Sequence, residues 1–164
     1  MADILHPILV VTTIATALIA GLFYSWACGI VQGLGKLKDK DYLQAMQSIN
    51  REIQRPLFLV FFVGTVLLLP VTTWLSYRAE QQSTFSWLLM ASILYIAGVF
   101  GVTIAGNVPL NNMLDRVKLT DSSPESITNL RAAFESKWNF LNRVRTICAV
   151  AALVCAVIAI TKLI

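Results

Sequence analysis

Residues 56–77 read PLFLVFFVGTVLLLPVTTWLSY, an apolar stretch without a single charged side chain. A helix needs about 20 mainly apolar residues to cross the hydrocarbon core of a bilayer. Three further stretches reach this length with modest interruptions, at residues 7–34, 85–108 and 140–163. The sequence therefore predicts an all-α integral membrane protein, in which four spans form one bundle and a single domain over residues 1–164.

The composition agrees with residence in a membrane, since 57% of the residues are hydrophobic and only 13% are charged. Soluble domains carry about a quarter charged residues. The first apolar stretch is too long for the core of a signal peptide, and no basic residue precedes it. We therefore expect it to be retained as the first transmembrane helix.

Basic residues are concentrated in two of the predicted loops. The loop between the first and second spans carries Lys36, Lys38, Lys40, Arg51 and Arg55. The segment between the third and fourth spans carries Arg116, Lys118, Arg131 and Lys137. We expect the protein to lie in the cell (inner) membrane. Because cytoplasmic loops are enriched in lysine and arginine, both segments are expected in the cytoplasm and both termini outside it. The orientation in the membrane then accounts for the excess of basic residues, and no nucleic-acid partner is expected.

Two of the spans are expected to continue as helices on the cytoplasmic side. Apolar residues recur at helical spacing from Leu43 to Ile53, which predicts an amphipathic helix that leads into the second span at Pro56. Before the fourth span, a serine followed by Pro124 is typical of a helix start. A helix over residues 124–162 would be roughly 55–60 Å long, well over the thickness of the membrane.

The first span carries a small residue at every fourth position. The members of this row are Ala17, Gly21, Ser25, Gly29 and Gly33. Small residues let helix backbones approach closely in a bilayer, where lipid tails supply no hydrophobic drive between helices. The favoured interpretation is packing within the bundle. The alternative is a homo-oligomer through Gly21, Ser25 and Gly29.

The fourth span begins with a polar face. Trp138, Asn142 and Arg145 follow the spacing i, i+4, i+7 and therefore share one side of a helix. Ala149 continues this side, which suits a surface that faces the bundle. Arg143 points elsewhere and is expected to reach the phosphate headgroups. The pattern thus favours an inward-facing Arg145.

Other helices carry amides at a similar level. Asn107 and Asn111 flank Pro109, which lacks a backbone N–H, so the third span is expected to bend or end there. Asn50 lies on the apolar stripe before the second span, and Gln32 lies on the small-residue row of the first. Buried polar groups in a membrane are costly, so each of these is a candidate for function.

These groups are expected to meet at the cytoplasmic mouth of the bundle, because each of the four helices contributes at least one. The candidate site residues are Gln32, Asn50, Asn107, Asn111, Trp138, Asn142 and Arg145. Asp115 and Glu135 are the nearest carboxylates, and we interpret both as solvated charges rather than catalytic bases. The only histidine, His6, lies at the opposite end, so the sequence predicts neither a metal site nor any other cofactor.

Short motifs along the four spans are characteristic in their order. They are Gly21-Leu-Phe, Trp26 to Gly29, Met46-Gln-Ser-Ile-Asn50, Pro56, Asn107-Val-Pro-Leu-Asn111, and Trp138 with Asn142-Arg-Val-Arg145-Thr. In these motifs the chain resembles the anthrone oxygenase-like family of small membrane proteins. The resemblance implies oxidation of anthrones to anthraquinones without metal or flavin.

The resemblance also implies roles for the candidate residues. Arg145 and Asn142 are expected to stabilise an oxyanion, in the manner of preorganised electrostatic catalysis. Trp138 is expected to stack on a flat polycycle. The remaining amides would contact the substrate, a small lipophilic molecule from the membrane.

Three hypotheses remain open from the sequence. The first is a cofactor-independent oxygenase of aromatic or quinone-like lipophiles. The second is a non-catalytic membrane binder or carrier that uses the same pocket. The third is an accessory structural subunit, in which the polar groups only tie helices together. Transport ranks low, because the sequence has neither internal repeats nor charges at the middle of the membrane.

Overall fold

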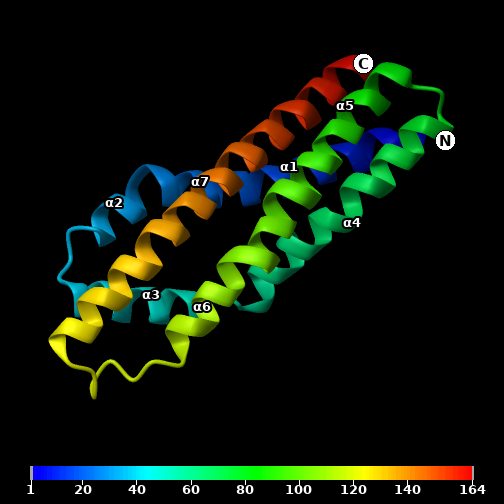
Figure 1. Cartoon of the computed structure of the whole chain (residues 1–164). Helices are drawn as coiled ribbons and strands as arrows, with labels where there is room; N and C mark the ends of the chain where they lie inside the picture. The colour runs from blue at the N-terminus through cyan, green and yellow to red at the C-terminus, as the bar shows by residue number, and fades with distance from the viewer. Residues whose placement is uncertain (1, 164) are drawn as a thin grey trace.

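The computed structural model describes residues 2–163, and these are helical apart from short connections (Figure 1). The elements are α1 (Ala2–Ser25), η1 (Trp26–Ile30), α2 (Val31–Leu34), α3 (Asp39–Glu52), α4 (Pro56–Arg78), α5 (Gln82–Ile93), η2 (Leu94–Gly101), η3 (Thr103–Asn107), α6 (Val108–Asp115) and α7 (Pro124–Leu163). The η elements are π-helical segments within longer helices.

Four continuous helices are long and apolar enough to cross a membrane. They cover Ile4–Leu34, Pro56–Arg78, Gln82–Asp115 and Pro124–Leu163. No β-strand occurs between residues 2 and 163. The predicted all-α bundle of four spans is thereby confirmed, and the chain is a multi-pass membrane protein.

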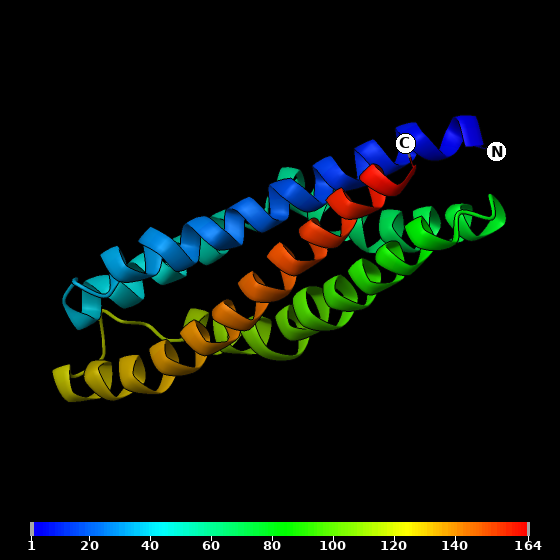
Figure 2. The same cartoon turned by 90° about the horizontal axis from the view of Figure 1, so that it is seen from above.

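The four spans pack side by side in a closed ring. Helix α1 packs against α7 and α4, and α5 packs against the same two helices from the other side. Figures 1 and 2 show both termini at one end of the bundle, together with the short turn between α4 and α5. Helices α2, α3 and α6 lie at the other end. Because both basic segments lie there, we call it the basic end.

Helix α3 precedes the second span, as the sequence predicts, but it is a helix separate from α4. Its buried side, which includes Tyr42, Leu43 and Met46, packs in a cluster with Phe134 of α7. The chain leaves the helical conformation at Arg55 (φ −66°, ψ 153°), because the residue before a proline disfavours the α region. Pro56 then occupies the first turn of α4, where its missing N–H costs nothing.

The third span does not end at Pro109, so the expectation that it ends there is wrong. The helix continues through α6 to Asp115. The turn before Pro109 is π-helical, and the N–H of Val108 donates to the carbonyl of Thr103 rather than to Ile104. This wide turn accommodates the proline ring, which would clash with the carbonyl four residues earlier in a regular α-helix.

The small-residue row of the first span faces away from the bundle. Gly21, Ser25, Gly29 and Gly33 are exposed, and a Cβ added at any of the three glycines would meet nothing within 4 Å. Packing within the bundle is therefore the wrong interpretation for these positions. The homo-oligomer through Gly21, Ser25 and Gly29 stays a prediction, which crosslinking of a Gly21→Leu, Gly29→Leu variant in native membranes would test.

Close helix approach is found instead between the third and fourth spans. A Cβ on Gly98 would lie 2.6 Å from Cβ of Cys148, and a Cβ on Gly106 would lie 2.8 Å from Cδ1 of Leu141. Gly98 is required for this packing, because Cβ of Cys148 cannot move without the backbone of α7, whereas a Cβ at Gly106 would displace only the end of the Leu141 side chain. These contacts hold the π-helical part of the third span against α7.

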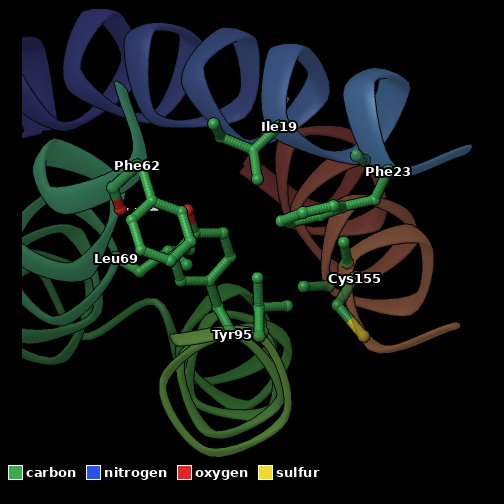
Figure 3. Packing of buried hydrophobic residues seen from close by; sticks show 11 residues of the cluster. Ile19, Phe23, Phe62, Leu69, Tyr95 and Cys155 are labelled. Atoms are coloured by element: carbon green, nitrogen blue, oxygen red, sulfur yellow. Dashed lines mark hydrogen bonds between the residues drawn. The ribbon is translucent and has the colours of Figure 1, made fainter. Parts of the chain in front are cut away.

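The middle of the bundle is filled by an apolar cluster (Figure 3). Figure 3 shows the labelled members of this cluster, which come from α1, α4, η2 and α7: Ile19, Phe23, Phe62, Leu69, Tyr95 and Cys155. The hydroxyl of Tyr95 donates to the carbonyl of Phe62 at 3.0 Å, so its one polar group is satisfied. Two of its members, Phe23 and Phe62, also face the cavity at the basic end that is described below.

Candidate functional site

A cavity of about 390 Å³ lies between the helices at the basic end. Every span contributes to its lining, and α3 adds Asn50. The apolar part of the wall consists of aromatic and aliphatic side chains, namely Phe23, Trp26, Ile53, Phe58, Leu59, Phe62, Ile104, Val108 and Trp138. The polar part comes from Asn50, Gln54, Thr103, Asn111, Asn112, Asn142 and Arg145. The cavity is thus mainly apolar with a polar side, as is usual for small-molecule sites.

Arg145 is the only charged residue in this lining. It is 6% exposed, with its guanidinium carbon 4.5 Å from the ring centre of Phe23 and 5.5 Å from that of Trp138. Nη2 donates to Oδ1 of Asn142 at 3.0 Å, and Nη1 donates to the hydroxyl of Thr103 at 3.4 Å. These two oxygens and two aromatic faces orient the cation.

The charge of Arg145 has no counter-ion. Across residues 4–163, no carboxylate lies within 4.0 Å of its guanidinium nitrogens, and Nε has no hydrogen-bond partner although it is buried. Removing an arginine from water is expensive unless it is paired. An arginine that is buried, oriented and unpaired is therefore suited to a ligand that brings its own negative charge or a strong acceptor.

Helical periodicity explains how α7 presents these groups. Trp138, Asn142, Arg145 and Ala149 are all buried and lie on one side of a single 40-residue helix. Arg143 is exposed on another side. The shared face predicted for α7 is therefore confirmed, whereas the functional roles of its residues stay predictions.

Trp138 connects α7 to the two neighbouring helices. Its Nε1–H donates to Oδ1 of Asn111 at 3.0 Å. Its ring centre lies 5.0 Å from that of Trp26, with the planes tilted by 48°. The two indoles form an aromatic corner beside Arg145, which is a suitable wall for a flat ligand.

Two further amides near the cavity have unused hydrogen-bonding groups. Nδ2 of Asn50 is buried without a partner, and Asn50 lines the cavity. Asn107 is 1% exposed, and neither its Oδ1 nor its Nδ2 has a partner. Asn107 lies in η3 between Thr103 and Asn111, but it is not itself part of the lining. Buried amides are normally satisfied, so these positions are candidates for contact with a ligand or water.

The structure does not bring Gln32 to this site, which corrects the expectation from the sequence. Gln32 is exposed on α2 and does not line the cavity. It continues the row of Gly21 and Ser25, and that row faces outward. The reason is that this helix directs its aromatic side, with Phe23 and Trp26, toward the bundle.

Most of the lining residues were missed in the sequence, and three of them contact Arg145 or Trp138 directly. Phe23 and Trp26 are three residues apart and share a helical face, and Thr103 lies four residues before Asn107. These spacings would have found them if the direction of each helix face had been known.

The carboxylates closest in sequence to the site have other partners. Asp115 accepts from Nε of Arg51 at 2.6 Å, and Glu135 accepts from Nε of Arg131 at 2.7 Å. Neither lines the cavity, and its described lining contains no carboxylate, histidine or cysteine. Any proton released in the cavity must therefore leave by way of water or the ligand itself.

The cavity is flanked by two exposed apolar side chains. Leu59 of α4 is 42% exposed, and Ile104 of η3 is 50% exposed. Both also line the cavity, so its edge lies on the lateral surface of the bundle between α4 and η3. This position is accessible to a lipophilic molecule dissolved in the bilayer.

A family model described as anthrone oxygenase matches residues 57–155. This range includes Asn107, Asn111, Trp138, Asn142 and Arg145, but not the α1 and α3 parts of the cavity. No curated protein and no solved structure matched the chain.

Proposed function

Since this chain belongs to the anthrone oxygenase family, we propose that it binds a small lipophilic aromatic or quinone-like molecule in the cavity around Arg145 and oxygenates it without a cofactor. The observation that carries this proposal is the buried guanidinium without a carboxylate partner. A ligand that ionises to an enolate or phenolate would supply the missing negative charge.

The shape of the site supports a flat ligand. A volume of about 390 Å³ lies within the range usual for small-molecule pockets. Trp26 and Trp138 offer aromatic faces, while Asn50 offers an unused N–H donor. The ligand would stack at the indole corner and direct its oxygen toward Nε of Arg145.

The chemistry of an anthrone suits such a site. Loss of a proton from the methylene carbon opposite the carbonyl gives an enolate, whose oxygen carries the charge beside Arg145. Stabilising this anion lowers the barrier to its formation, because the donors are already oriented. The proton passes to water at the cavity edge, since the lining supplies no carboxylate or histidine.

The enolate is electron-rich enough to react with dioxygen itself. A carbon–oxygen bond forms at the former methylene carbon and gives a peroxide anion, which takes up a proton. Loss of the second hydrogen from that carbon and cleavage of the O–O bond then release water and leave a carbonyl. One dioxygen is consumed for each anthrone, and one anthraquinone and one water are formed.

The test uses the purified protein in lipid nanodiscs with anthrone as substrate. Wild-type protein should consume one dioxygen per anthrone and form anthraquinone well above the protein-free rate. Arg145→Ala should lose most of this activity. Arg116→Ala removes an equal charge from an exposed position outside the cavity and should remain active. Wild-type protein that neither binds a polycycle nor consumes dioxygen would contradict the proposal.

The alternative is a non-catalytic membrane binder or carrier of a lipophile, or an accessory structural subunit. The unused amide groups of Asn50 and Asn107 are compatible with binding alone. Anthrone binding without dioxygen uptake would favour the binder. A protein whose stability is unaffected by any added polycycle would favour the structural role.

We also propose that the protein lies in the inner membrane of the cell, with its basic end in the cytoplasm. Lysine and arginine are enriched in the α2–α3 and α6–α7 connections, which supports this orientation. Alkaline phosphatase fused after Ile164 should then be active outside the cytoplasm. A fusion that is made at full length but is inactive would reverse the proposed topology, because the disulfides of the enzyme do not form in the reducing cytoplasm.

A further inference from the structure

A second hollow lies between the third and fourth spans, two of the four spans that line the cavity. This groove, of about 660 Å³, runs between α7 and the η3–α6 segment. Its lining shares no residue with the cavity around Arg145. Gly106 and Leu141 lie in close contact at its base, and Pro109 and Phe140 form apolar sides.

Two cations lie along this groove. Lys137 and Arg143 both line it, and both are exposed. In the described part of the chain, neither has a carboxylate within 4.0 Å. The groove therefore combines a positive rim with an apolar floor, and no acidic side chain neutralises it.

These two cations lie where the apolar part of α7 begins, which is the level of a membrane boundary. The helix carries charged residues up to Arg145 and is then free of charge until Lys162. Lys137 and Arg143 are six residues apart, which corresponds to about 9 Å along the helix. Phe140 lies between them and is 59% exposed, so an apolar side chain points outward at the same level. Cations with aromatic neighbours at this depth are typical of the headgroup region.

We propose that this groove is a binding site for a phospholipid with an anionic headgroup. Lys137 and Arg143 contact the phosphate and headgroup, and one acyl chain lies over Leu141 and Phe140. Basic pockets between transmembrane helices are a known solution for anionic lipids. Neutral phospholipids fill the apolar floor equally well, but they carry no net charge for the two cations.

The experiment compares two lipids on the same protein. Protein solubilised in mild detergent is incubated with phosphatidylglycerol or phosphatidylcholine of identical chains, and retained lipid is counted by native mass spectrometry. Wild-type protein should retain phosphatidylglycerol about tenfold better. The Lys137→Gln, Arg143→Gln variant should lose this preference, whereas Lys137→Arg, Arg143→Lys should keep it.

The matched control is Arg116→Gln, Lys118→Gln, which removes the same charge from the same end of the bundle. Both of its positions are exposed and lie outside the groove. This control should retain the preference for phosphatidylglycerol. Equal retention of both lipids by the wild type would overturn the proposal. An equal loss in the control would also overturn it, because the effect would then come from general surface charge.

Discussion

Two arginines of α7 show how differently one helix can use the same side chain. Arg131 lies in the extension beyond the apolar part of the helix, and Arg145 lies in the cavity. Both are largely shielded from water, with 14% of the Arg131 side chain and 6% of Arg145 exposed. They differ in the hydrogen-bond acceptors that their guanidinium N–H groups contact.

Arg131 is surrounded by acceptors. Its partners are the carboxylates of Asp39 (3.0 Å) and Glu135 (2.7 Å) and the carbonyls of Gly35 (2.9 Å) and Leu37 (2.7 Å). These groups fasten the connection between α2 and α3 to α7. Arg145 has one amide oxygen, one hydroxyl and no carboxylate, and its Nε is unused. The comparison teaches that the donors of a structural arginine such as Arg131 are all used, whereas Arg145 keeps a free donor, as the proposed binding of a ligand would require.

The largest effect is expected from removing the cavity cation. Arg145→Met should lower anthrone-dependent dioxygen uptake by about 10² to 10³, the usual cost of losing one oriented donor in a dry site. The same variant should unfold at an equal or higher temperature, because a buried unpaired charge has been replaced by an apolar chain. Oxygen electrode rates and thermal unfolding in detergent measure both. A large loss of stability would show that Arg145 is a structural residue, and Arg145 would then not differ in role from Arg131.

The converse change is Arg131→Met. It should destabilise the protein by about 3 kcal/mol, because two carboxylates and two carbonyls lose a shared partner. Activity per folded molecule should stay within about threefold of wild type, since Arg131 does not line the cavity. The readout is the unfolding midpoint together with the activity of the folded fraction. If activity falls while stability is kept, the two arginines have been assigned the wrong way round.

A matched pair of asparagines sharpens the contrast on the third span. Asn107→Leu removes a buried amide without partners and should stabilise the free protein by about 1 kcal/mol. Asn111→Leu leaves the indole N–H of Trp138 without its acceptor and should destabilise by about 1–2 kcal/mol. Thermal unfolding of the two variants in the same detergent should therefore shift in opposite directions. Shifts of the same sign would mean that Asn107 has a partner in the membrane.

The smallest effect concerns the acidic partner of Arg131. The hydroxyl of Thr128 donates to Asp39 and, together with Arg131, lowers the pKa of this carboxyl below its ordinary value of 3.8. A depressed pKa in the folded state contributes stability above pH ~4 that is lost as the pH falls through the folded value. Asp39→Asn should thus lower the unfolding midpoint slightly at about pH 6 and hardly at all at about pH 2.5. Asp41→Asn is the control from the same turn, because Asp41 is exposed.

The helices themselves could be predicted from the sequence. Apolar runs of sufficient length gave the four spans, Pro124 marked the start of α7, and Pro56 marked the start of α4. The buried face of α7 also followed from spacing, since polar and small residues alternate there with exposed large ones. These features depend on local geometry and on the thickness of the membrane, which the sequence records directly.

The side of the first span that packs against the bundle could not be predicted from the sequence. In a bilayer both sides of a helix are apolar, so hydropathy does not tell which side meets the other helices. Gly21 and Gly29 suggested close packing, but the bulkier side with Phe23 faces inward. Gln32 was misplaced for the same reason. The π-helical turns were also missed, because no residue pattern in 94–107 predicts the backbone hydrogen bonds between residues i and i+5 that define them.

Those turns decide how the site responds to a change in the length of the chain. A π-turn holds one residue more than an α-turn, and each residue of an α-helix advances by about 100°. Deleting one residue between Leu94 and Asn107 would therefore let a π-turn become an α-turn, and the side chains that follow would keep their directions. Deleting one residue between Val108 and Asn111, in regular α-helix, would instead rotate Asn111 away from Trp138. The third span thus tolerates a change of length in its π-helical part but not beyond it.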